Sequence, residues 1–283
     1  MALNKFSGFS DEISSDTTVQ FNILNKLGIK FFEPRGIDGK NISELSISEA
    51  KELKKKMDSF GIQASSIGSP IGKVYLTDDF DAHFKLFCHV VEIAKILGAK
   101  YIRMFSFYNH DEWNDESRKE VIARLGKMID HAKKENVVLL HENEKDIYGD
   151  TARRCLDLMH ELGCNNFKAV FDPANFVQCG ENTLEAFEMM QDYVEYMHIK
   201  DSKANGTVVP AGMGEGNIEK ILGILSKKEY NGFISLEPHL GKFDGLQNLE
   251  LDDDMLKLPD SGEDTFALAF NALCELINHI ENK

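Results

Sequence analysis

One local pattern constrains the fold more than any other feature of this sequence. An amphipathic stretch ends in an apolar residue followed by glycine, and a short apolar run comes next. The pattern occurs at Leu27-Gly28, Phe60-Gly61, Leu97-Gly98 and Leu162-Gly163. Glycine directly after a helix suits the left-handed conformation in which many helices end. Because short apolar runs are typical of strands buried on both faces, the repetition indicates βα units and a parallel sheet.

Eight strands and eight helices can be placed from this pattern. We expect strands near residues 6–9, 30–33, 62–67, 101–105, 137–142, 168–172, 194–199 and 232–237. We expect helices near 16–27, 46–60, 80–97, 116–135, 151–161, 182–190, 217–228 and 264–280, with Asp16, Ser48 and Thr183 as N-caps. This alternation predicts the α/β class and a closed (β/α)₈ TIM barrel, as one domain over residues 1–283. An open doubly wound sheet is the alternative, but no glycine-rich phosphate loop follows the first strand.

Composition and charge exclude several classes of protein. The formal net charge is -15, and so acidic a surface repels nucleic acid, which we therefore do not expect as a partner. The chain has no apolar run of about 18 residues, so no membrane-spanning helix is expected. It begins without the apolar core of a signal peptide, and its five cysteines form no CxxC pair. We expect a reduced, cytoplasmic protein.

Four consecutive predicted strands end in residues that can ligate a metal. Glu142 ends the fifth, Asp172 the sixth, His198 the seventh and Glu237 the eighth. Their spacing matches the pitch of βα units, which predicts one layer at the C-terminal rim. Three carboxylates at such close range repel each other unless a cation neutralises them. Oxygen-rich ligands with one imidazole predict a single divalent metal ion, Mn²⁺ first, with Mg²⁺, Co²⁺ or Zn²⁺ open. For any one of these residues alone, a loop ion pair is the alternative.

Other polar residues at the same rim are candidates for binding substrate. Arg103 ends the fourth strand among apolar neighbours, and a buried arginine needs an anionic partner. That partner is either a metal-site carboxylate or a substrate oxygen. Lys200 lies two residues beyond His198, and His239 lies two residues beyond Glu237. For His239, contact with substrate and a structural role in the loop both stay open. His141 alternates with Glu142, so we expect it to face the other way as a structural histidine.

Two connections are too long to be plain turns, and both belong to the C-terminal face where barrel enzymes keep their sites. The connection 200–216 contains a glycine-rich stretch, Gly212 to Gly216. This stretch is either a phosphate cradle at a helix N-terminus or a plain lid loop, which we favour. The connection 239–263 carries apolar residues among acidic ones. It could cover the site or pack on a second subunit, so a homodimer is possible. Glu33 and Arg35 flank Pro34 after the second strand, and for them an ion pair and a functional role stay open.

These motifs resemble the xylose isomerase-like TIM barrels, including sugar epimerases of the tagatose 3-epimerase type. The resemblance extends over nearly the whole chain. Its most specific segments are His141-Glu142-Asn143-Glu144, Phe171-Asp172-Pro173-Ala174-Asn175-Phe176, His198-Ile199-Lys200-Asp201, Pro210-Ala211-Gly212 with Gly214-Glu215-Gly216, and Leu236-Glu237-Pro238. It implies that Glu142, Asp172, His198 and Glu237 ligate the metal, and that Glu142 and Glu237 are the catalytic acid/base pair. The implied substrate is a small carbohydrate.

The implied reaction is sugar, sugar phosphate or sugar acid isomerisation or epimerisation. The metal acidifies a C–H next to the carbonyl, one glutamate removes that proton to give a cis-enediolate, and the other returns a proton. Two positions depart from the family pattern. Asn175 stands where many family epimerases have a substrate-contacting histidine, and Glu144 follows Glu142-Asn143 where they often have His. Asn175, a candidate substrate-binding residue, can hydrogen-bond a hydroxyl but cannot transfer a proton.

Three alternatives to an isomerase stay open at this point. The first is a polyol dehydratase similar to inosose dehydratase. The second is a metal-dependent apurinic endonuclease of the same fold, which needs several additional histidines for a zinc cluster. The ends of strands two and three offer Glu33 and Ser65-Ser66 instead. The third is a non-catalytic sugar-binding barrel, for which a set of metal ligands has no evident use.

Overall fold

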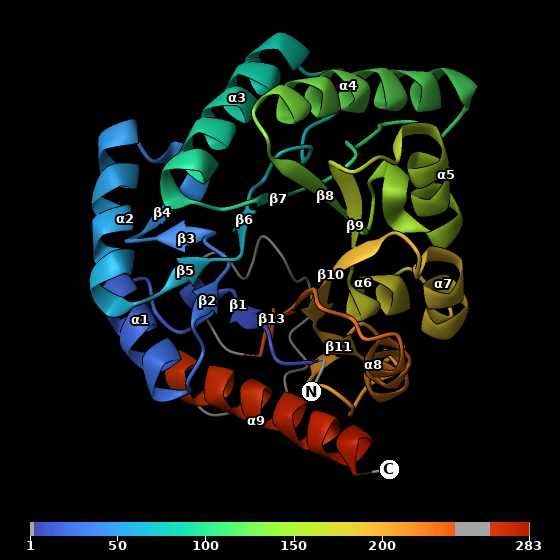
Figure 1. The fold of residues 1–283 in the computed structure, drawn as a ribbon. Helices are drawn as coiled ribbons and strands as arrows, with labels where there is room; N and C mark the ends of the chain where they lie inside the picture. The colour runs from blue at the N-terminus through green and yellow to red at the C-terminus, as the bar shows by residue number, and fades with distance from the viewer. Residues whose placement is uncertain (1–2, 241–260, 283) are drawn as a thin grey trace.

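A ring of parallel strands lies inside a ring of helices in the computed structural model, which describes residues 3–240 and 261–282 (Figure 1). The barrel strands are β1 (Phe6–Gly8), β2 (Phe31–Phe32), β5 (Gln63–Ala64) with β6 (Ser66–Gly68), β7 (Tyr101–Met104), β8 (Val138–Glu142), β9 (Phe167–Phe171), β10 (Val194–Ile199) and β13 (Phe233–Leu236). The outer helices are α1 (Thr17–Lys26), α2 (Ile47–Phe60), α3 (Phe80–Leu97), α4 (Asp115–Lys134), α5 (Ala152–Leu162), α7 (Thr183–Met190), α8 (Ile218–Lys227) and α9 (Gly262–Glu281). The predicted (β/α)₈ barrel is confirmed.

The sheet closes through its shortest strand. Seven strands pair in the order β1-β13-β10-β9-β8-β7-β6. Strand β2 pairs in parallel with β5, and the amide of Glu33 donates to Gly8 O of β1 at 2.9 Å. On the other side the amide of Gly68 donates to Pro34 O at 2.9 Å. Every strand therefore has a partner on both sides, which is the condition for a closed barrel without edges.

The interior of the barrel changes from apolar to polar along β8 and β10. Strand side chains alternate between the helices and the interior. Leu140 and Tyr196 face the interior in the small core at its base, whereas the opposite faces pack on the helices in the main core. Two residues further along the same strands stand Glu142 and His198. The polar end is the C-terminal end, so the fold itself positions the candidate site there.

The N-cap of α1 is the predicted residue, but the caps of two other helices are not. Asp16 accepts the amide of Thr18, as expected. Helix α2 is capped by Ser46 in a reciprocal capping box with Glu49, so the prediction of Ser48 was wrong. A capping box needs an acid or amide three residues on, and only the Ser46 register supplies one. Asn182 caps α7, so the prediction of Thr183 was also wrong.

Several short elements were not predicted. They are the 3₁₀ turns η1 (Ser10–Glu12), η2 (Ile42–Glu44) and η3 (Tyr148–Asp150), helix α6 (Pro173–Gln178), and the hairpins β3 (Gly36–Ile37) with β4 (Lys40–Asn41) and β11 (Asp201–Ser202) with β12 (Val208–Val209). The long connection 200–216 thus contains a hairpin. Most of the connection 239–263, on which the dimer expectation depends, lies outside the described residues. Among the helices of the described ranges, none is both long and apolar enough to cross a membrane.

Candidate metal centre

Glu142, Asp172, His198 and Glu237 lie together at the C-terminal end of the barrel. Glu142 is the last residue of β8, Asp172 follows β9, His198 lies in β10 and Glu237 follows β13. All four side chains are buried. One candidate ligand atom from each falls within 4.8 Å of the others. The common layer that the sequence predicted at this rim is therefore present in the fold.

The cluster is arranged around one nitrogen atom of the histidine. Nδ1 of His198 lies 2.7 Å from Glu142 Oε1, 3.1 Å from Glu237 Oε2 and 4.0 Å from Asp172 Oδ2. Within the described ranges, Glu142 Oε2, Asp172 Oδ2 and Glu237 Oε2 are buried and receive no hydrogen bond. Buried carboxylate oxygens normally have hydrogen-bond partners. Three oxygens and one imidazole nitrogen at this range suit a single divalent cation, so these residues could hold one.

Basic side chains surround the cluster and reduce the repulsion between its carboxylates. Arg103 Nη1 lies 3.2 Å from Glu142 Oε2, and Lys200 Nζ lies 3.2 Å from Asp172 Oδ2. The opposite oxygen of Glu237, Oε1, lies 3.1 Å from a guanidinium nitrogen of Arg35. Each carboxylate thus has a fixed cationic neighbour, which orients it without using all of its lone pairs.

The same neighbours shift the pKa values within the cluster. Burial alone would lower the pKa of His198, but the negative charges of Glu142 and Glu33 outweigh it and raise the pKa well above its usual value. Burial would raise the pKa of Glu237, but the charge of Lys200 and the close contact with His198 hold it well below the usual range. Glu237 is therefore ionised at neutral pH, as both a metal ligand and a general base must be.

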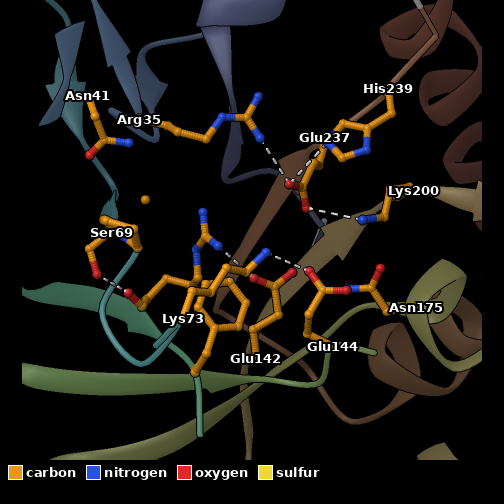
Figure 2. A pocket seen from close by; sticks show the side chains of 14 residues that line it. Arg35, Asn41, Ser69, Lys73, Glu142, Glu144, Asn175, Lys200, Glu237 and His239 are labelled. Carbon is orange, nitrogen blue, oxygen red and sulfur yellow. Dashed lines mark hydrogen bonds and ion pairs between the residues drawn. The ribbon is translucent and has the colours of Figure 1, made fainter. Parts of the chain in front are cut away.

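A cavity of about 100 Å³ opens above the cluster, which is room for a small molecule. Figure 2 shows Glu142 and Glu237 approaching it from different sides in that view. The four predicted substrate-binding residues all line it: Asn175, Arg103, Lys200 and His239. Asn175 donates its side-chain amide to Asn143 O at 2.9 Å, which fixes its orientation. His239 Nε2 lies 3.3 Å from Glu237 Oε1, so it also helps to hold that carboxylate.

One wall of the cavity carries an ion pair that the sequence did not predict. Lys73 Nζ lies 2.9 Å from Glu144 Oε2, and both residues line the cavity (Figure 2). Lys73 also lies over the ring of Phe105, 4.4 Å from its centroid. Lys73 is therefore part of the pocket wall. Glu144, one of the two departures from the family pattern, is therefore a pocket residue with a fixed cationic partner.

His141, in contrast, points away from the site. Its Nε2 lies 3.0 Å from Ser106 Oγ, which also accepts the amide of Gly149. Burial lowers the pKa of His141 to about 3, so the ring is neutral. A Cβ on Gly149 would lie 2.3 Å from this ring, so the residue must be glycine. These contacts describe the structural histidine that the alternation along β8 predicted.

The glycine-rich stretch after β12 encloses a carboxylate of the chain itself. Asp201 accepts the amides of Gly212 and Gly214 on Oδ2, and those of Gly216 and Ser202 on Oδ1, at 2.8 to 3.0 Å. A Cβ on Gly214 would lie 2.3 Å from Asp201 Oδ1. These N–H groups have the arrangement of an anion nest, but Asp201 fills it. Asp201 therefore anchors this loop, and the amides that it occupies are not available to bind a phosphate group.

We expect Asp201→Ala to lower the free energy of unfolding by about 2–4 kcal/mol, because several enclosed amides lose their acceptor at once. Equilibrium urea unfolding measures this change. Glu215→Ala is the matched control in the same loop: among the described residues, its exposed side chain accepts only the amide of Ala204, at 3.2 Å. We expect the control to change stability by less than about 1 kcal/mol. Equal effects of the two substitutions would contradict the anchoring role of Asp201.

Fold and site together define the class of the protein: a (β/α)₈ barrel whose C-terminal face carries a buried cluster of three carboxylates and a histidine that could hold a metal. The chain belongs to the xylose isomerase-like TIM barrel family, whose model matches residues 21–257. No protein of curated function matches the sequence.

Solved structures with the same fold are similar over most of their length. The IolI protein with a bound zinc atom has a TM-score of 0.76 and 16% identity, and the match covers 98% of this chain and 99% of that one. A D-tagatose 3-epimerase-like protein has a TM-score of 0.74 and 16% identity, covering 99% of both chains. The probable 3-DHS dehydratase AsbF from Bacillus anthracis has a TM-score of 0.70 and 17% identity, covering 83% of this chain and 92% of that one. Identities this low show the shared fold alone.

Proposed function

We propose that the protein is a divalent-metal-dependent isomerase or epimerase of a small sugar or sugar derivative. The observation that carries this proposal is the placement of His198 Nδ1 between 2.7 and 4.0 Å from three buried carboxylates at the floor of a polar pocket. A non-catalytic binding barrel would have no need to bury so many like charges, which is costly. Family membership supports the same class of chemistry.

The proposed ligands are Glu142, Asp172, His198 and Glu237. A divalent ion held there supplies Lewis-acid polarisation of a substrate carbonyl, which acidifies the neighbouring C–H. The choice among Mn²⁺, Mg²⁺, Co²⁺ and Zn²⁺ depends on small differences in ligand geometry and on availability. Mn²⁺ is our first candidate, because hard oxygen ligands outnumber the single imidazole.

Glu142 and Glu237 are the proposed acid/base pair. Glu237 is ionised and is held by Arg35 and His239, so it can receive a proton without moving far. Glu142 is held by Arg103 and His198. One carboxylate removes the proton next to the carbonyl, and the other delivers a proton. Delivery to the opposite face of the same carbon gives an epimer, and delivery to the neighbouring carbon gives an isomer.

Deuterium exchange tests this proposal across a panel of candidate substrates. Protein loaded with Mn²⁺ is incubated in D₂O with ketopentoses, ketohexoses, ketose phosphates, sugar acids and inososes, and each mixture is analysed by mass spectrometry. We expect at least one compound to gain deuterium next to its carbonyl, and we expect EDTA to prevent this. Protein that binds metal but exchanges no proton in any of these compounds would rule out the proposed reaction.

A dehydratase is the second candidate, because a lysine adjoins the proposed base. Lys200 Nζ lies 3.7 Å from Glu237 Oε2 and lines the pocket. In an elimination, a carboxylate takes the proton from carbon while a cationic acid such as Lys200 protonates the departing hydroxyl, which leaves as water. The same incubation distinguishes the two reactions, because a dehydratase yields a product lighter by one water.

A further inference from the structure

A buried carboxylate that is not one of the proposed ligands lies directly beneath the metal centre. Glu33 directly follows β2, and its side chain is 0% exposed. Its Oε2 atom accepts the hydroxyl of Tyr196 at 3.0 Å and that of Ser235 at 2.9 Å. It also lies 3.2 Å from His198 Nε2. The three contacts come from β10 and β13, the strands that also carry His198 and lead to Glu237.

This contact defines which nitrogen of His198 is free for the metal. A neutral imidazole carries one N–H, and the group next to the other nitrogen decides where that hydrogen resides. In the metal-free protein a carboxylate lies at each nitrogen, Glu142 at Nδ1 and Glu33 at Nε2, so both nitrogens can carry a hydrogen. A cation held by Glu142, Glu237 and Asp172 would need the lone pair of Nδ1, and Glu33, which can only accept, would then keep the remaining hydrogen on Nε2.

Other contacts hold Glu33 and the imidazole ring in place. The rings of Phe9 and Tyr196 pack edge-on against His198, with centroids 5.2 and 5.7 Å away. The hydroxyl of Tyr196 also lies 2.8 Å from Ser65 Oγ, which in turn lies 2.6 Å from Ser7 Oγ. The carboxylate beneath the metal centre is therefore part of a hydrogen-bonded network that joins several strands of the barrel.

We propose that Glu33 is a positioning residue of the metal centre: it sets the tautomer and the orientation of His198, so that Nδ1 is presented to the ion. This inference rests on the proposed metal site but not on the reaction that the site performs.

Metal affinity tests this role without a substrate. Mn²⁺ and Co²⁺ are titrated into wild-type protein and into Glu33→Ala and Glu33→Gln variants in competition with a chromophoric chelator. Loss of an outer hydrogen-bond partner of a metal ligand typically weakens binding by about 10–100-fold, which we expect for Glu33→Ala. Glu33→Gln keeps an acceptor for Nε2 but not the charge, so we expect a smaller loss. The visible absorption spectrum of bound Co²⁺ should change in Glu33→Ala, because a reoriented imidazole alters the coordination.

Tyr196→Phe is the matched control. It removes another hydrogen bond to the same oxygen of Glu33 but leaves the contact to His198 intact. We expect its affinity for Co²⁺ to stay within about threefold of wild type and its Co²⁺ spectrum to be unchanged. If both Glu33 variants bind as tightly as wild type, or if Tyr196→Phe loses as much affinity as Glu33→Ala, the positioning role is wrong. If Glu33→Ala does not fold, the comparison of Glu33→Gln with Tyr196→Phe decides.

The outcomes also separate this inference from the proposed function. Wild-type protein that binds Co²⁺ tightly but exchanges no substrate proton would end the isomerase proposal and leave the role of Glu33 standing. Normal proton exchange by wild type, together with unaltered metal binding in the Glu33 variants, would support the isomerase proposal and rule out the role of Glu33. Wild-type protein that binds neither ion would overturn both.

Discussion

Glu142→Gln and Glu237→Gln are each expected to lower kcat by on the order of 10²–10⁴-fold on whichever substrate the deuterium screen identifies. Glutamine has nearly the shape of glutamate and can still offer its carbonyl oxygen to a metal, but it can neither take up nor return a proton. Part of the loss will also arise from weaker metal binding, because each substitution removes one ligand charge. Rates are therefore measured at saturating metal, with the bound metal quantified in the same samples.

Glu144→Gln provides a comparison within the same pocket. Its side chain is paired with Lys73 and is not among the four clustered ligand atoms. We expect it to alter KM more than kcat, because it can contact substrate but is not placed to exchange protons at the metal centre. If Glu144→Gln abolishes turnover while Glu142→Gln and Glu237→Gln keep at least a tenth of it at saturating metal, the assignment of the acid/base pair is wrong.

The clustering of the four proposed ligands could be predicted because the signal is local to each strand. Parallel strands in a βα barrel all end at one rim, so a polar residue directly after a buried run is placed there whatever its neighbours are. The lengths of the strands and helices follow from the same apolar periodicity. The pattern does not predict the exact first residue of a helix: Ser46, not Ser48, caps α2. A cap depends on a single hydrogen bond rather than on a periodic pattern.

The contacts that surround the four proposed ligands could not be predicted from the pattern of individual strands. Glu33 and His198 are 165 residues apart, and they meet only because the barrel closes. Arg35 had several acidic candidates in the sequence, and only the curvature of the barrel brings it to Asp11 and Glu237. Such contacts depend on register and closure, which the pattern of one strand does not contain.

Asp201 is an intermediate case. For the glycines from Gly212 to Gly216 the sequence favoured a plain lid loop over a phosphate cradle, and the structure has a loop whose amides do gather around an anion. The sequence could not show that the anion is a side chain ten or more residues upstream. The nest is satisfied internally, so a phosphorylated substrate would depend on the basic residues of the pocket instead.

Asp172→Asn is expected to change stability in opposite directions with and without metal. Burial, with a smaller contribution from the charges of Glu237 and Glu142, raises the pKa of Asp172 from 3.8 to about 6 despite Lys200 nearby. Ionising this group at pH 7 therefore costs the metal-free protein about 3 kcal/mol, which the neutral asparagine avoids. Asparagine can still accept the amide of Asn175 as N-cap of α6, and Lys200 retains Glu237 as a neighbour.

The pH dependence of the free energy of unfolding provides a second test of this prediction. The folded protein binds the Asp172 proton more tightly than the unfolded chain does, so this carboxyl stabilises the fold below about pH 4. That contribution is lost as the pH rises through about 6. We expect the free energy of unfolding of metal-free wild type, relative to Asp172→Asn, to fall across this range. Asp157→Asn should behave oppositely and destabilise the protein at pH 7, because hydrogen bonds from Arg118 lower the pKa of Asp157.

Metal should reverse the order of stability at pH 7. A ligand at 1,000 times its Kd adds about 4.1 kcal/mol to the stability of the protein that binds it. If loss of this ligand weakens binding by about 10³-fold, the same concentration adds only about 0.4 kcal/mol to Asp172→Asn, so the difference exceeds the cost of ionising Asp172. Urea unfolding with Mn²⁺ or with EDTA measures both terms. A variant less stable than wild type under both conditions would show that the carboxylate is there for the fold, whereas the predicted crossing means that the fold tolerates an unfavourable buried charge because the metal needs it.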